Sequence, residues 1–161
     1  MYTVTFDPTN YLPGMLFHLA FPPQLQPSSP NLLACTPLAG VSAELTCAYQ
    51  AENRTLVVRG AFEGAIEPKV IKFQVGNVTN PGGEVRTESF RAYTRTPEGW
   101  LIDQREGELY IDFKCALPCK TCIAGNNTGC ASCYIDDNSR GLPRHLWQSY
   151  CVDRCPLSTF I

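Results

Sequence analysis

The most reactive side chains of this sequence are its nine cysteines, seven of which lie within the last 47 residues. Clustered cysteines can be oxidised to disulfides or can bind zinc as thiolates. Two C-x2-C pairs, Cys119 with Cys122 and Cys130 with Cys133, would supply four zinc ligands. The seven-residue gap between Cys122 and Cys130 is shorter than the roughly 12 to 20 residues of common zinc modules, so disulfides are favoured.

The cluster has the spacing C-x3-C-x2-C-x7-C-x2-C-x17-C-x3-C-P and begins at Cys115. It resembles the furin-like cysteine-rich repeat of growth-factor receptors, proprotein convertases, R-spondins and surface proteins of protists. The match is carried by Cys119-Lys120-Thr121-Cys122, Cys130-Ala131-Ser132-Cys133 and Cys151-Val152-Asp153-Arg154-Cys155-Pro156. The resemblance implies three disulfides: Cys115 with Cys122, Cys119 with Cys130, and Cys133 with Cys151.

Two further cysteines, Cys35 and Cys47, lie twelve positions apart with the turn-prone Gly40 between them. This spacing predicts a local disulfide across two neighbouring strands, worth about 3 kcal/mol by loop-closure arguments. Because clustered thiols are cross-linked only in an oxidising compartment, we expect an extracellular or cell-surface protein whose secretion signal has been removed.

Three N-glycosylation sequons, at Asn53, Asn77 and Asn126, agree with that location and predict N-linked glycans. The charged residues balance almost evenly, 13 basic against 15 acidic, and form no basic block that would bind nucleic acid. No apolar stretch approaches the roughly 20 residues that a membrane span needs.

Catalytic chemistry finds little support in this composition. The imidazole bases are His18 and His145, the first inside a strand-like run and the second in a loop after Pro143-Arg144. Gly82-Gly83 is not followed by a helix, so it does not form a phosphate-binding loop. We therefore expect a protein that is not an enzyme and that holds no metal or cofactor.

The residues before the cysteine cluster read as short strands separated by turn residues, at about one strand per ten residues. No amphipathic helix separates them, which predicts an all-β sandwich of about eight strands, immunoglobulin-like or jelly-roll, over residues 1–113. A small disulfide-rich module follows over 114–161. The expected strands are 2–6, 15–21, 44–49, 55–59, 70–75, 89–94, 100–103 and 108–113.

The sandwich region is also similar to β-rich segments that precede furin-like repeats in protist extracellular surface and filament proteins. The similarity rests on Val78-Thr79-Asn80-Pro81 leading into residues 88–94, then on a glycine turn at Gly99 and the run 100–103.

The first expected strand belongs to an N-terminal segment, residues 1–8, that could pair with a neighbour's sheet as well as with its own. Tyr2, Val4 and Phe6 alternate with threonines, so strand addition would insert all three into a partner's core. We therefore expect a structural protein that forms homo-oligomers or homopolymers, as a filament or a surface coat. The alternative is a monomeric ligand-binding, receptor or adhesin ectodomain with a protein or carbohydrate surface as its partner.

The family's pairing leaves Cys155 without a partner, so we expect either a chain that continues past Ile161 or a Cys155 that is free or bonded to another chain. Of these we favour continuation. Intact-mass measurement after alkylation without reduction tests the bonded states: we expect no alkyl group on Cys155. An alkylated Cys155 would exclude both a downstream and an intermolecular disulfide.

Overall fold

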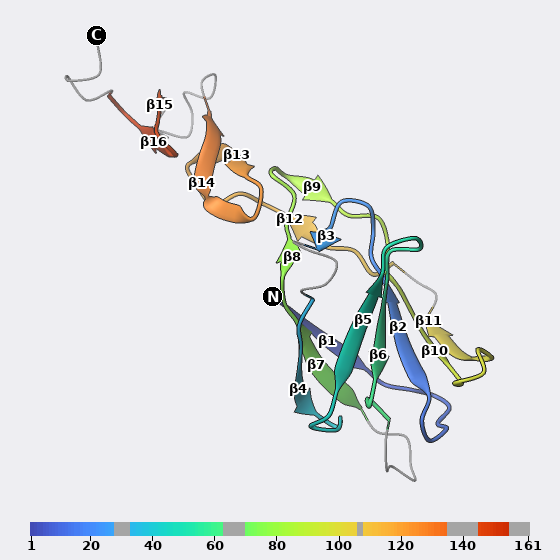
Figure 1. Cartoon of the computed structure of the whole chain (residues 1–161). Coiled ribbons are helices and arrows are strands. Elements are labelled where there is room, and N and C mark those ends of the chain that lie inside the picture. Colours follow the sequence, from blue (N-terminus) through green and yellow to red (C-terminus); the bar gives the residue numbers. More distant parts are fainter. Residues whose placement is uncertain (28–32, 63–69, 106–107, 135–144, 155–161) are drawn as a thin grey trace. The chain divides into compact units, whose positions relative to one another are not determined.

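The structure is a computed structural model that describes residues 1–27, 33–62, 70–105, 108–134 and 145–154. The chain divides into two compact units, of which the first comprises residues 1–79 and 88–110 and the second residues 80–87 and 111–161. Every regular element of the described residues is a β-strand (Figure 1), which confirms the all-β class.

The first unit is a sandwich of two antiparallel sheets, as predicted. The three-stranded sheet has the order β1 (Tyr2–Phe6), β7 (Ile71–Val75), β4 (Cys35–Ala39). The five-stranded sheet has the order β11 (Leu101–Arg105), β10 (Arg91–Arg95), β2 (Leu16–Ala20), β6 (Thr55–Arg59), β5 (Thr46–Gln50). A separate short pair is formed by β3 (Gln26–Pro27) and β8 (Val78–Thr79).

The strand order is that of an immunoglobulin constant-type sandwich, in which one sheet has the order A-B-E-D and the other C-F-G. Here β2, β4, β5, β6 and β7 take the positions B to F in chain order. The position of strand G beside β7 is filled by β1, from the opposite end of the chain, and β10 takes position A. The N-terminal strand therefore closes the smaller sheet.

One predicted strand is wrong, and one strand of the two sheets was missed, besides two-residue strands such as β3 and β8. Of the run 108–113, only Asp112–Phe113 (β12) is a strand, and it belongs to the second unit. The eighth strand of the two sheets is β4, which pairs with β7 alone among the described strands. Its Pro37 hides the strand signal but is tolerated because proline fits an edge strand.

The sandwich core lies between the two sheets. Phe17 is completely buried and contacts Phe6 and Phe73 of the other sheet, with ring centroids 5.0 and 5.6 Å apart. Phe73 is also completely buried, and the fully buried aliphatic and methionine side chains are Met15, Leu25, Leu56, Val58, Ile71 and Val75. At one side of the sandwich, the disulfide Cys35–Cys47 joins β4 to β5.

Within its described residues, the second unit has three antiparallel strand pairs and a core of buried cystines. β13 (Cys119–Ile123) pairs with β14 (Asn126–Cys133), and β15 (His145–Trp147) pairs with β16 (Tyr150–Val152). The third pair is β9 (Val85–Arg86) with β12. The six half-cystines of the second unit are at most 8% exposed and take the place of an apolar core, as expected for so small a unit.

Residues 80–87 belong to this second unit, whereas the sequence division at 113 assigned them to the sandwich. The contacts explain the difference. The Arg86 guanidinium donates to both carboxylate oxygens of Asp112, at 2.7 and 3.2 Å, and the Gly125 amide donates to the Asn80 carbonyl at 3.2 Å. These partners lie too far along the chain for local sequence patterns to reveal.

Replacement of Phe17 by alanine should test the core. We expect Phe17→Ala to lower the free energy of unfolding by about 3–5 kcal/mol, because a buried aromatic ring leaves a cavity between both sheets. Leu38→Ala is the control, since that side chain is 52% exposed on the edge strand β4, and it should change stability by less than about 0.5 kcal/mol. Urea unfolding followed by circular dichroism measures both; equal losses would contradict this account of the core.

Candidate assembly site

The predicted assembly residues Tyr2, Val4 and Phe6 lie on the inner face of β1. Tyr2 and Val4 are half-buried and Phe6 is buried, whereas Thr3 and Thr5 are exposed. The inner three stand opposite Val75, Phe73 and Ile71 of β7, and all three of those side chains are buried. The three apolar residues that alternate with threonines in the sequence are therefore the ones that pack β1 against β7 of its own chain.

Phe6 links β1 to the core more closely than the other inner residues. Its ring lies 5.0 Å from that of Phe17 in the opposite sheet, and Phe17 packs edge-on against Phe73 at 5.6 Å. Aromatic pairs with this geometry add about 0.5–1.5 kcal/mol beyond the area they bury. Removal of β1 would expose this cluster, so the site beside β7 needs a strand in it.

The outer edge of β1 lacks the usual protections of an edge strand. Among the described strands it pairs only with β7, in an unbroken register, and it contains no charge, proline or bulge. The other edge of the same sheet, β4, contains Pro37 and a register shift after it. The edge strand β11 of the other sheet is also irregular, with a shift between Thr94 and Arg95 of its neighbour β10.

The segment between β1 and β2 is held at two points. Asp103 of β11 accepts a hydrogen bond from the Asn10 backbone amide at 2.9 Å and another from its side-chain amide at 2.7 Å. The Tyr11 hydroxyl donates to the Phe62 carbonyl at 2.5 Å, and the Tyr11 and Phe62 rings meet edge-on with centroids 6.1 Å apart. Before Asn10 the segment contains only Asp7, Pro8 and Thr9.

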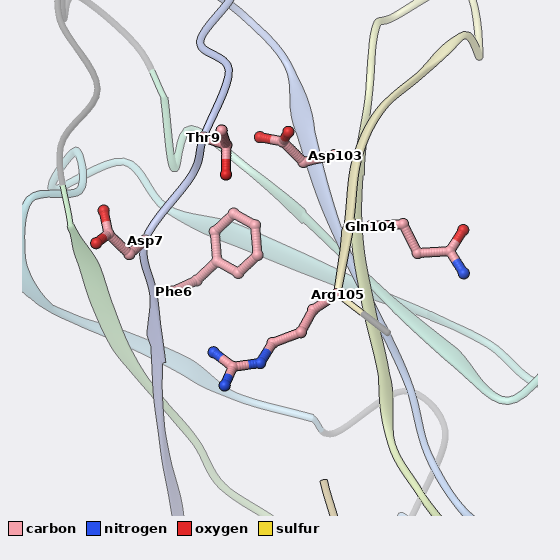
Figure 2. Close-up of a pocket in the computed structure, with 6 residues that line it drawn as sticks. All are labelled: Phe6, Asp7, Thr9, Asp103, Gln104 and Arg105. Atoms are coloured by element: carbon pink, nitrogen blue, oxygen red, sulfur yellow. The ribbon is translucent and has the colours of Figure 1, made fainter. Parts of the chain in front are cut away.

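An open cavity of about 320 Å³ lies beside the end of β1, with Phe6, Asp7 and Thr9 on one side. The other side is formed by Asp103, Gln104 and Arg105 of β11. Figure 2 shows the Phe6 ring and the Arg105 guanidinium between these two walls, while Gln104 points away. The edges β1 and β11 are thus not paired with each other. The cavity leaves room beside the point where β1 joins the segment that leads to β2, which we call the linker.

The cysteines form the pairs expected from the sequence and the resemblance. The disulfides are Cys35–Cys47, Cys115–Cys122, Cys119–Cys130 and Cys133–Cys151. These bonds use the thiols that a zinc site would need at the two C-x2-C pairs. Cys155 lies outside the described residues, so its state stays a prediction.

The three sequon asparagines are exposed. Asn53 lies in the turn between β5 and β6, where its side-chain amide donates to the Gln50 side chain at 3.0 Å. Asn77 follows β7 with a positive φ of 57°. Asn126 begins β14, and its side-chain oxygen accepts from the amides of Thr128 and Gly129, both at 3.1 Å. All three can be reached by solvent.

The two histidines, His18 and His145, belong to different units of the chain. His18 is half-buried on the outer face of the five-stranded sheet, and its ring stacks on Tyr93 with centroids 4.8 Å apart. Burial lowers the pKa of His18, and the positive charge of Arg95 lowers it further. His145 is exposed at the start of β15.

Comparison of the chain with models of known protein families, with curated proteins and with solved structures finds no match in any of the three. Within the described ranges, no helix is long and apolar enough to cross a membrane. The assembly site must therefore be interpreted from its own geometry.

Burial raises the pKa of Tyr2 to about 12, above the ordinary value of 10.0. The folded state thus favours the neutral phenol, so stability is complete below pH 10 and decreases as the pH rises from 10 to 12. We expect the free energy of unfolding of the wild type to fall more steeply across this window than that of Tyr2→Phe. Urea titrations at several pH values compare the slopes; parallel curves would contradict the burial of Tyr2.

Proposed function

We propose that this protein is an extracellular structural protein, a subunit of a filament or cell-surface coat whose copies join by exchange of β1. The observation that supports this proposal is that the N-terminal strand fills the position of strand G. In an immunoglobulin-type sandwich that strand completes the sheet beside strand F, so a subunit without it would leave the β7 edge and the core open. A β1 from a second copy has the side chains that fit there.

The exchange needs few new contacts, because β1 of one copy would meet in another copy the same residues that it meets in its own. Domain swapping of this kind is a low-cost route to assembly. The strand is regular and uncharged. Its inner side chains would pack in a partner against the same buried residues of β7 that they face in their own chain.

The extracellular location and the furin-like nature of the second unit belong to the same proposal. Four disulfides are expected of a protein that folds in an oxidising compartment. The exposure of Asn53, Asn77 and Asn126 is compatible with N-linked glycans at each. The three disulfides of the second unit have the pairing of furin-like repeats.

A monomeric ligand-binding or adhesin ectodomain is the second candidate. It is favoured by a shallow depression of about 240 Å³ on the outer face of the five-stranded sheet, lined among others by Arg91, Tyr93 and Arg95. Arginine and tyrosine side chains suit acidic carbohydrate or protein surfaces. This role requires β1 to remain in its own chain, which separates the two candidates.

Cysteine substitutions on the outer face test the exchange directly. Thr3 of β1 stands opposite Gln74 of β7, and directly opposed strand residues lie within disulfide reach. We expect co-expression of differently tagged full-length Thr3→Cys and Gln74→Cys variants to give a covalent heterodimer on non-reducing gels. With Cys155→Ser in both variants and in the control, such a bond forms only if β1 of one copy lies against β7 of the other.

The matched control replaces Gln74→Cys by Lys72→Cys, which stands opposite Thr5 and is two residues out of register with Thr3. Diagonal neighbours are about 7–8 Å apart, too far for a disulfide. The control should give only background cross-linking. If both mixtures give the same background although all variants fold by circular dichroism, β1 stays in its own chain and the proposal fails.

A further inference from the structure

The direction and length of the chain around β1 bear on how two copies exchange it. β1 ends at Phe6, and β2 begins at Leu16 on the same end of the sandwich, since Phe6 packs against Phe17. Figure 1 shows the loop from β1 leading to the start of β2 at the lower end of the sandwich. We call this the linker end.

The linker is short because it is fixed at Asn10. The double hydrogen bond to Asp103 leaves four Cα steps from Phe6 to Asn10, which span at most about 14 Å when fully extended. Pro8, within this stretch, restricts its conformation further. The contact of Tyr11 with Phe62 fixes the chain immediately after this double hydrogen bond.

An open arrangement in which the copies stack end to end along the strand direction needs a longer linker. There the donor's linker end would face the opposite end of the acceptor, yet the seated β1 must still finish at the acceptor's linker end. The linker would have to run the length of the strand, about 17 Å for five residues, in addition to the gap between the copies. The reach of about 14 Å is too small for that path.

From these constraints we propose that β1 is exchanged reciprocally, between two copies that meet at their linker ends around a twofold axis. This inference rests on the proposed function and names its partner as one second copy of this chain. Each short linker then crosses directly to the facing sandwich, and both sites beside β7 are filled at once. The contact is isologous and closed, so exchange alone stops at a dimer.

Growth of a larger assembly beyond this dimer would depend on surfaces other than the exchanged strand. The chain passes into the second unit after Thr79, returns at Glu88 and leaves again after Tyr110. Thr79 follows the end of β7, Glu88 precedes the start of β10, and Tyr110 follows the end of β11. All of these strand ends are opposite the linker end, because Val75 pairs with Tyr2 and Arg91 pairs with Ala20. The exchanged dimer thus carries two cysteine-rich units for further contacts.

A double variant, Thr3→Cys with Gln74→Cys in one full-length chain, distinguishes the arrangements. A Cys155→Ser background removes the remaining unassigned thiol, and the same background without the double substitution is the control. Reciprocal exchange predicts that most of the oxidised protein migrates as a covalent dimer on non-reducing gels. A ladder of trimers and longer species would overturn the reciprocal arrangement but not the exchange itself. A covalently closed monomer without dimer would overturn both.

The contacts that hold the segment between β1 and β2 allow a second test with its own control. Asp103→Ala together with Tyr11→Ala in the double variant removes both points at which the segment after β1 is held. The free linker then lengthens, so species longer than the dimer should increase several-fold. Gln104→Ala, the neighbour that points away in Figure 2, should leave the pattern unchanged. If the variant with both Asp103→Ala and Tyr11→Ala folds and still stops at the dimer, linker length does not set the arrangement and this inference is wrong.

Discussion

The packing of Phe17 between Phe6 and Phe73 is the contact on which the sandwich depends. It joins the five-stranded sheet to both β1 and β7 of the smaller sheet, so the core is incomplete unless some strand occupies the first position. A sheet of three strands offers little other surface for the larger sheet to cover. The five-residue strand β1 therefore completes the core of the sandwich.

The sequence predicts those parts of the fold that depend on local patterns. Alternation of apolar and polar residues is enough to find β1, including the inward side chains Tyr2, Val4 and Phe6, because the period of two follows directly from strand geometry. The spacing of the cysteines likewise leads to all four disulfides, through strand proximity for Cys35 with Cys47 and through the furin-like resemblance for the others.

Features that depend on distant partners could not be predicted in this way. Asn10 and Asp103 are 93 residues apart, and neither carries a signal that identifies the other. The position of β1 at the place of strand G follows from pairing order, which alternation leaves open. Pro37 conceals β4 because its tolerance depends on that strand being an edge, and edge status is a property of the assembled sheet.

The exposed asparagines of the sandwich bear on which end of the sandwich could meet another copy. Asn53 precedes the start of β6 at Thr55, which pairs with the last residue of β2, and Asn77 follows the end of β7. Both sequons of this unit therefore lie at the end away from the linker between β1 and β2. Under the proposed function, sugar chains at these two positions would shield the end of the sandwich away from the linker and leave the linker end bare for contact with another copy.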